Sequence, residues 1–158
     1  MDPSGTSRSP LLIPLFSVLL LVALAGCQSG GGGGGGGRAA GVPGSKYDAG
    51  PRAGEGEIDE AMAKTGERLF REKGCSACHA FGARLSGPDL KGVTMRRTAL
   101  WMEHQILEPE VMVKEDPISR GLFAQYALQM TNLHLAPAEA KAVIEHLKHM
   151  DHEAAEAK

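Results

Sequence analysis

The chain has 158 residues, a formal net charge of -2 and a sequence pI of about 6.3. This balance lacks the excess of basic residues that is typical of nucleic-acid-binding proteins, so we expect no nucleic-acid partner. Only about 100 residues have a composition that can pack into a domain, and aromatic residues make up 4% of the chain. A domain of that size buries a small core, which an internal apolar cofactor would enlarge.

Residues 1–26 have the layout of a bacterial secretory signal peptide. The run from Leu11 to Leu24 is almost wholly apolar, but it is short for a membrane span. It ends in Leu24-Ala25-Gly26-Cys27, which resembles the lipobox of bacterial lipoproteins. This resemblance implies cleavage before Cys27 and a lipid anchor on its thiol, at the periplasmic side of the inner or the outer membrane. An uncleaved anchor and an ordinary signal with an incidental cysteine are the alternatives.

Residues 27–56 are predicted to form a flexible tether. Eight consecutive glycines run from Gly30 to Gly37, and Gly, Ala and Pro are frequent in the remainder up to Gly56. Such a composition does not supply a packed core. A flexible chain of this length reaches roughly 30 Å and would hold a globular domain off a membrane surface. The alternative is a tail without a role.

Residues 57–152 are predicted to form one all-α domain, followed by a polar tail over 153–158. Apolar residues recur at helical spacing over 58–70, with charged residues between them. Gly74 stands where a helix C-terminal glycine belongs. A helix of about 14 residues is therefore expected to lead into the segment that follows Gly74.

That segment is the pentad Cys75-Ser76-Ala77-Cys78-His79, the attachment signature of a c-type haem. One helical turn separates Cys75 from Cys78, so both thiols can bond to vinyl groups at one edge of the porphyrin. His79 would then bind the iron as the proximal ligand. A redox disulfide or half of a zinc site are the alternatives, although no cysteine lies downstream to complete the latter. Export supports the haem hypothesis, because bacteria attach haem c outside the cytoplasm.

Further helices are expected after a looped region. Thr98 can cap a helix that stops before Pro109. A turn at Pro117 precedes a short helix that is expected to end near Met130. Pro137 is well placed as the first residue of a final helix. No convincing strand pattern occurs.

From Ile58 to Met150 the sequence resembles the class I, single-haem cytochrome c family. Gly66-x-x-x-Phe70 precedes the pentad as in the family's first helix, and Glu139–His149 is similar to its last helix, which crosses the first near that glycine. Gly87-Pro88-x-Leu90 stands where the family's proline carbonyl accepts a hydrogen bond from the proximal histidine. The resemblance implies an all-α fold wrapped around one covalently bound haem c.

The segment Met130-x-Asn132-Leu133-x-Leu135 resembles the family's distal methionine loop. This implies that Met130 is the second axial ligand of the iron. Met112, expected in a loop, and His134 remain alternative ligands. The chain departs from the family pattern at Thr131, where proline is common, at His134, where glycine is common, and at His146, where an aromatic residue often faces the first helix.

The resulting hypothesis is a membrane-tethered periplasmic electron carrier, not an enzyme, and a monomer. Its donor and acceptor would be redox proteins, such as a respiratory complex, a terminal oxidase or a denitrification reductase. Lys91, Arg96 and Arg97 could line the haem edge and meet an acidic partner, or form a solvated face. Two other hypotheses stay open. One is a sensor or peroxidase-like enzyme whose distal site opens. The other is a haem-free lipoprotein that uses Cys75 and Cys78 for metal or thiol chemistry.

Overall fold

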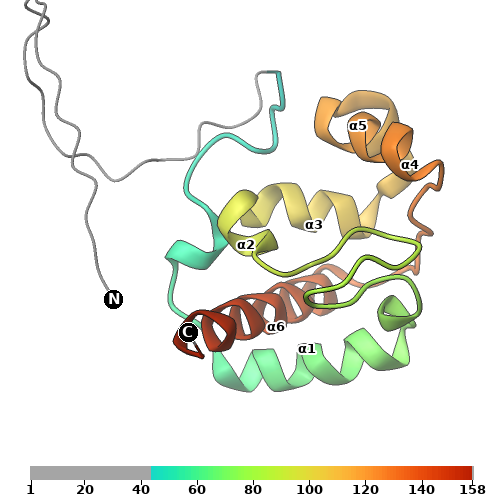
Figure 1. Ribbon diagram of the computed structural model, residues 1–158. Helices are drawn as coiled ribbons and strands as arrows, with labels where there is room; N and C mark the ends of the chain where they lie inside the picture. Colours follow the sequence, from blue (N-terminus) through green and yellow to red (C-terminus); the bar gives the residue numbers. More distant parts are fainter. Residues whose placement is uncertain (1–43, 158) are drawn as a thin grey trace, which may run out of the picture. The chain divides into compact units, whose positions relative to one another are not determined.

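The computed structural model describes residues 44–157; the predicted signal peptide and Cys27 lie outside them. Within 44–157 the chain forms helices and no strand, which confirms the all-α prediction (Figure 1). The elements in chain order are η1 (Ala53–Glu55), α1 (Glu60–Glu72), η2 (Cys75–Ala77), α2 (Val93–Arg96), α3 (Ala99–Leu107), α4 (Pro109–Glu115), α5 (Pro117–Tyr126) and α6 (Pro137–Glu156). None of the helices in this described part combines the length and hydrophobicity that a bilayer crossing needs.

Helix α1 is the predicted first helix, and local chemistry sets both of its ends. The Asp59 carboxylate accepts a hydrogen bond of 2.9 Å from the Met62 N–H and so caps the first turn. After the last turn, Gly74 adopts a positive φ of 84°, which reverses the chain at little steric cost. The buried side of the helix consists of Ala63, Gly66, Leu69 and Phe70.

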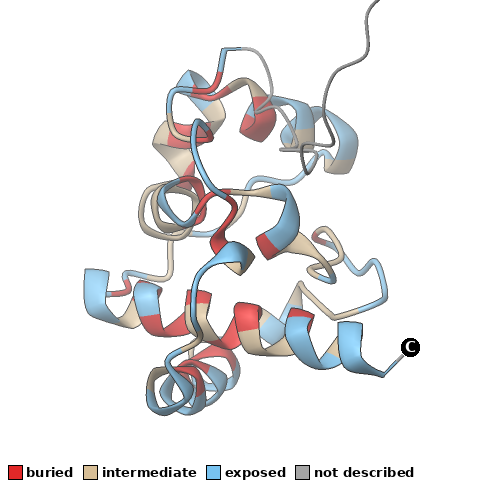
Figure 2. Ribbon diagram, turned by 90° about the vertical axis from the view of Figure 1, so that its left-hand side faces the viewer, coloured by how far each residue is buried: buried red, intermediate tan, exposed pale blue. Residues whose placement is uncertain are grey.

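Helices α1 and α6 cross in direct backbone contact at Gly66. A Cβ atom at this position would lie 1.9 Å from the carbonyl oxygen of Ala142, so only glycine allows the approach. The buried residues of the two helices face each other (Figure 2). An ion pair of 3.2 Å between Lys73 and Glu139 joins the end of α1 to the start of α6.

His146 takes the place of the aromatic residue that the resemblance to cytochrome c predicts in the last helix. It is buried, and its ring centroid lies 5.6 Å from that of Phe70 and 5.9 Å from that of Phe81. Burial lowers the pKa of His146, which favours the neutral imidazole in this aromatic cluster.

The segment between Pro109 and Asp116 is helical, so the prediction of a loop there was wrong. Both predicted ends of the helix before this segment are confirmed. Thr98 caps α3 by accepting the Trp101 N–H, and α3 ends before Pro109. Pro109 then starts α4, since a proline fits the first turn of a helix, where its missing N–H costs nothing. Met112 consequently lies in α4 and is fully buried.

Helix α5 ends earlier than expected, at Tyr126 and not near Met130. Asp116 caps its first turn by accepting bonds from the N–H groups of Ile118 and Ser119, both 3.0 Å long. Ala127 closes the helix with a positive φ of 51°. Met130 therefore stands in a segment without regular secondary structure, three residues beyond the residue that closes α5.

Helix α6 begins at Pro137 as predicted, and the Ala136 N–H donates to Glu139 across its first turn at 2.8 Å. It continues to Glu156, so most of the predicted polar tail is the last turn of this helix. Pairs spaced by four residues line this end: His149 Nε2 lies 3.2 Å from Glu153, and His152 lies 3.7 Å from Glu156.

Residues 44–56 form a strap that packs on the domain, so the predicted flexible tether does not extend to residue 56. Asp48 is fully buried and pairs with Arg52 at 3.0 Å. It also accepts the Thr98 N–H at the start of α3, at 2.8 Å. Arg52 donates to the carbonyl oxygen of Arg96 at 2.9 Å. The strap is thereby fixed to the junction of α2 and α3.

A second group of contacts joins the strap to α3 and to the start of α5. The Ser45 hydroxyl donates to Asp116 at 2.5 Å, and the ring of Tyr47 lies 4.2 Å from that of His104. The Thr98 hydroxyl donates to the Tyr47 carbonyl oxygen at 2.6 Å. Composition did not predict that residues 44–56 pack on the domain, because mainly polar side chains hold them in place and few apolar ones do.

Candidate functional site

The domain contains an apolar cavity of about 330 Å³ that opens to the surface, within the size range of small-molecule and cofactor sites. Its walls come from the end of α1, from α2, α3, α4, α5 and α6, and from the loops around them. Four predicted site residues line it: Cys75, Cys78 and His79 of the pentad, and Met130, which lies about 50 positions further along the chain. Pro88, the fifth predicted residue of the haem site, lines it too.

The pentad forms a tight turn at the edge of this cavity. Helix η2 covers Cys75–Ala77, and the Cys75 carbonyl oxygen accepts the N–H groups of Cys78 at 3.2 Å and His79 at 3.0 Å. The two cysteines are half-buried and not joined to each other. Burial raises the pKa of the Cys75 thiol, whereas a reactive redox cysteine has a lowered pKa.

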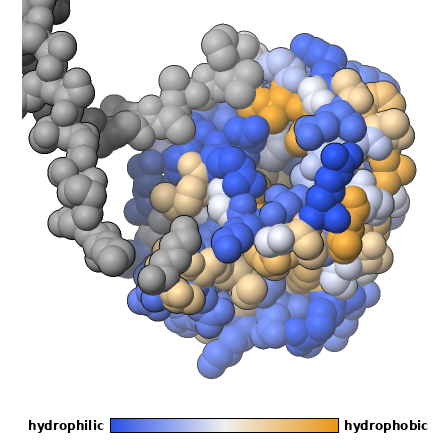
Figure 3. All heavy atoms as spheres, in the orientation of Figure 1, coloured by the Kyte–Doolittle hydropathy of each residue, from blue (hydrophilic) through white to orange (hydrophobic). Residues whose placement is uncertain are grey.

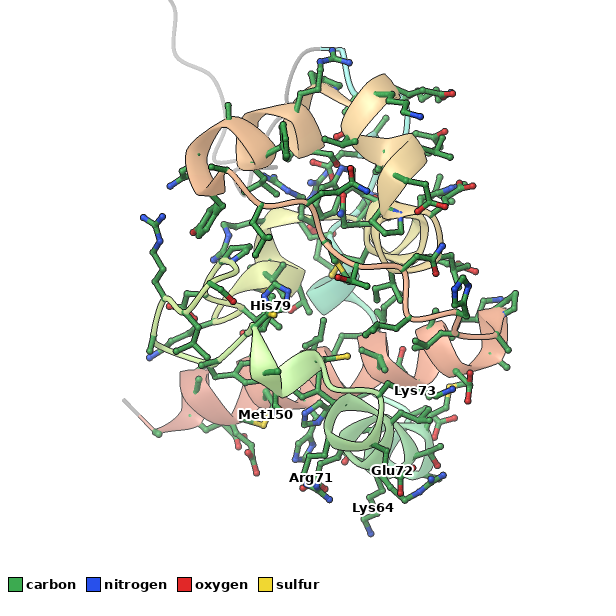
Figure 4. The ribbon with its side chains drawn as sticks, turned by 90° about the vertical axis from the view of Figure 1, so that its right-hand side faces the viewer. Lys64, Arg71, Glu72, Lys73, His79 and Met150 are labelled. Carbon is green, nitrogen blue, oxygen red and sulfur yellow. The ribbon has the colours of Figure 1, made fainter. Side chains whose placement is uncertain are left out.

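His79 is held in one orientation by the chain that follows it. Its Nδ1 lies 2.9 Å from the Pro88 carbonyl oxygen. A carbonyl oxygen only accepts, so Nδ1 carries a proton, and in the neutral imidazole Nε2 then has the free lone pair that an iron ligand requires. A Cβ at Gly87 would lie 2.7 Å from His79 Cε1, so Gly87 leaves the space that the ring uses. In Figure 4 the His79 side chain lies between the α1–α6 pair and the group of α3, α4 and α5.

The segment after α5 is pinned at Asn132, two residues beyond Met130. The Asn132 amide donates to the Leu107 carbonyl oxygen at 3.0 Å and to Glu110 at 3.2 Å. Its side-chain oxygen accepts the N–H of His134 at 2.9 Å. These bonds attach the loop to the junction of α3 and α4 and support the Met130 side chain at the cavity.

The two alternative ligands lie elsewhere. His134 is exposed, has a positive φ of 53° and does not line the cavity. A left-handed backbone is one that glycine adopts at the least steric cost. Met112 is part of the core and does not line the cavity either.

The three basic residues that were predicted to line the haem edge, Lys91, Arg96 and Arg97, have different surroundings. Arg96 and Arg97 line the cavity, and Lys91 does not. Arg97 is held by Asp48 of the strap, 3.5 Å away, and its guanidinium lies 5.2 Å from the Trp101 ring centroid. Burial lowers the pKa of Arg97. Arg96 is exposed, and is thus the basic side chain of this run that a partner could meet at the cavity.

Hydrophobic side chains also reach solvent beside the cavity. Phe123 is 45% exposed and Leu128 is 51% exposed, and both line the cavity. On the face shown in Figure 3, hydrophobic residues appear in separate places among hydrophilic ones. On α1, Lys64, Arg71 and Glu72 form part of a charged, solvent-facing side (Figure 4).

Sequence reasoning missed a polar group next to Met130. Gln105 of α3 lines the cavity and its amide nitrogen lies 3.8 Å from Met130 Sδ. Gln105 follows Met102 by three positions and Trp101 by four, so it stands on the core-facing stripe of its helix. A polar residue on such a stripe is a signal that could have identified it.

Asp116 is a buried carboxylate that accepts a hydrogen bond from Trp101, on the same helix as Gln105. Burial by itself raises the pKa of the Asp116 carboxyl, but hydrogen bonds from Ser45 and Trp101 outweigh burial and lower it. The carboxylate therefore stays ionised at neutral pH and accepts the Trp101 Nε1–H at 2.9 Å.

The fold and this site define a small all-α domain built around an apolar cofactor cavity, with a C-x-x-C-H segment at the cavity's edge. A model of the cytochrome c family matches residues 63–151, more than half of the chain. Cytochrome c from Rhodothermus marinus has a similar structure, with a TM-score of 0.59 and 34% sequence identity. That match covers 61% of this chain and 83% of the other. The chain belongs to the cytochrome c family.

Two bacterial relatives match shorter stretches. Cytochrome c-551 of Azotobacter vinelandii is 48% identical over 33 residues, which are 21% of this chain and 40% of that protein. Cytochrome c-551 of Stutzerimonas stutzeri is 37% identical over 43 residues, 27% of this chain and 41% of that protein. The chain thus spans about two fifths of these relatives' length. Family membership implies one covalently bound haem c, and the apolar cavity with its free His79 lone pair and Met130 thioether fits that group.

Proposed function

We propose that this protein carries electrons one at a time between redox proteins on the periplasmic side of a bacterial membrane. The observation that carries the proposal is the shared cavity of Cys75, Cys78, His79 and Met130, with Nδ1 of His79 bonded to the Pro88 carbonyl oxygen. Bound haem c would supply a reversible one-electron change at its iron. The redox partners would be a respiratory complex, a terminal oxidase or a denitrification reductase.

Each of these residues would have a distinct task. Cys75 and Cys78 would hold the cofactor by thioether bonds. Nε2 of His79 and Sδ of Met130 would be the iron ligands, a pair that raises the reduction potential relative to two histidines. The apolar lining would exclude water.

Covalent attachment can be tested on a denaturing gel. We expect the wild-type protein, made in cells competent for cytochrome c maturation, to keep its haem after boiling in detergent and to stain for haem peroxidase activity. The Cys75→Ala/Cys78→Ala variant should give an unstained band, because no thioether bond remains. A colourless wild-type band would contradict the proposal. Rapid binding of carbon monoxide by the reduced wild type would instead favour the sensor or peroxidase-like alternative.

We further propose that residues 1–26 are a cleaved signal peptide and that Cys27 carries the lipid. The folded strap begins by residue 44, so the proposed tether shortens to 27–43 and its reach from roughly 30 Å to roughly 23 Å. Stable anchoring needs more than one acyl chain, as bacterial lipoproteins have. The chain has a net charge of -2, so we expect little electrostatic attraction to an anionic membrane surface beyond the lipid anchor.

The Cys27→Ser variant tests the anchor. We expect it to accumulate in the soluble periplasmic fraction or to remain unprocessed, because the lipid acceptor is missing. The wild type should incorporate a labelled fatty acid and sediment with membranes. If the variant is cleaved and still sediments with membranes, the lipid is not what holds the protein there.

A further inference from the structure

A side-chain contact between Arg84 and Tyr126 joins two walls of the cavity at its rim. The loop over residues 80–92 contributes one wall, which includes Pro88, and the end of α5 contributes another, which includes Tyr126. The guanidinium carbon of Arg84, in that loop, lies 4.3 Å from the ring centroid of Tyr126. A guanidinium over a tyrosine ring is attracted by the electrons of the ring face. Arg84 is exposed and does not line the cavity, so this contact, the Arg84–Tyr126 clasp, lies on the outer side of the two walls.

The loop that carries the arginine of the clasp is closed on itself. The Asp89 carboxylate accepts the N–H groups of Gly82 at 2.7 Å and of Lys91 at 2.8 Å, and so joins the two ends of the loop. The same loop orients His79 through the Pro88 carbonyl oxygen. The arginine therefore projects from a segment whose position is set by its own hydrogen bonds and by the histidine of the pentad.

The end of α5 has a different kind of support. Among the helices of the described part of the chain, α5 packs mainly against α4, and the two lie next to each other in Figure 1. Hydrogen bonds to Asp116 fix the first turn of α5, whereas Tyr126, its last residue, is held by packing and by the clasp. Met130 follows Tyr126 by four positions and precedes Asn132, which is bonded to the Leu107 carbonyl oxygen. The Met130 segment thus lies between two fixed points, and the clasp is part of the first.

We propose that Arg84 is a positioning residue that, through Tyr126, keeps the Met130 segment closed over the cavity and so slows the entry of outside ligands. The inference rests on the proposed function, in which Met130 is an iron ligand. A small Lewis base such as imidazole can replace the Met130 sulfur only when this segment moves outward. That motion displaces the end of α5 from the loop over residues 80–92 and breaks the clasp. The clasp would therefore favour electron transfer over the binding of small molecules.

The test compares Arg84→Gln with Arg120→Gln in the oxidised, haem-loaded protein. Arg120 is also exposed and lies on α5, but it donates to the Lys114 carbonyl oxygen and has no ring contact, so it matches the change of charge. Imidazole binding is followed by the loss of the weak far-red band that reports iron–sulfur bonding. We expect imidazole to bind about two- to fivefold faster to Arg84→Gln, the effect of one exposed cation–π contact. Arg120→Gln should bind it at the wild-type rate.

Changes at Tyr126 show whether Arg84 acts through the ring. Tyr126→Phe keeps an aromatic face and should keep the wild-type rate. In a Tyr126→Leu background, Arg84→Gln should have no further effect, because the contact is already lost.

Hydrogen exchange of the backbone amides over residues 127–133 gives a second readout. It should be faster in Arg84→Gln, whereas exchange in α1 should match the wild type. A general loss of stability would speed exchange in both regions and would contradict a role confined to the Met130 segment.

Met130→Leu separates the two ways in which the idea can fail. If this variant loses the far-red band while Arg84→Gln binds imidazole at the wild-type rate, the ligand assignment stands and the clasp is refuted. If Arg84→Gln has its full effect in the Tyr126→Leu background, Arg84 acts by its charge alone and the clasp is again refuted. If the wild type has no such band, or Met130→Leu retains it, the ligand assignment is wrong and the inference is overturned with it.

Discussion

Replacing Met130 by leucine is expected to change the iron more than replacing any other methionine. The leucine fills a similar volume but has no lone pair, so the iron loses one of its two proposed protein ligands. The oxidised protein should lose its weak far-red band. The reduction potential should fall by on the order of 100 mV, a fraction of the roughly 0.8 V that axial ligands span. Optical spectroscopy during a redox titration measures both quantities.

Met102→Leu is the matched control, because Met102 also lines the cavity and is buried. A change between these two side chains of similar volume in a core usually costs less than about 1.5 kcal/mol, and we expect the spectrum to stay that of the wild type. The opposite pattern, with the band lost in Met102→Leu and kept in Met130→Leu, would mean that the sulfur ligand had been misassigned. A wild type without the band, together with a changed spectrum in His134→Ala, would point to two histidines.

Gly66→Ala should strongly destabilise the domain. The added Cβ would lie 1.9 Å from the Ala142 carbonyl oxygen and 3.0 Å from His146 Cβ. The first contact is to backbone, so no side-chain rotation relieves it and α1 must move away from α6. Overpacking of a core costs about 1–3 kcal/mol and sometimes more. We expect about 3 kcal/mol, equivalent to a fall of roughly 12 °C or more in the midpoint of thermal unfolding.

Gly121→Ala controls for the change of residue type. Gly121 also lies within a helix, α5, but a Cβ there would meet nothing within 4 Å. Alanine has the higher helix propensity, so this variant should be as stable as the wild type or more stable, by up to about 1 kcal/mol. Circular dichroism of the helices follows unfolding in both cases. Equal midpoints for Gly66→Ala and the wild type would show that the crossing tolerates a side chain.

The predictions that succeeded rest on local chemistry. Thr98 caps α3 and Pro137 starts α6 because capping and proline geometry act within one turn of the chain. The first helix follows from hydrophobic spacing, and its end follows from a glycine placed after the last apolar residues, where the structure has a positive φ. The C-x-x-C-H spacing of the pentad is likewise a short-range pattern.

The features that only the tertiary structure decided depend on partners distant in sequence. Asp48 and Arg52 are charged residues that composition assigns to a solvated tether, and they are buried because Thr98 and the Arg96 carbonyl oxygen satisfy them. The loop predicted around Met112 is a helix whose methionine the core encloses.

Gln105 shows the same contrast between local pattern and distant contacts at the site. The sequence determined that Met130 follows a helix and precedes Asn132, but not what stands beside its sulfur. That neighbour is 25 positions away, on α3, and it is oriented by Ser119 of α5. Local pattern therefore specifies the helix starts at Thr98 and Pro137, the glycine after α1 and the haem attachment signature. Hydrogen bonds between remote residues, which form only when the whole chain has packed, decide the surroundings of the proposed ligand.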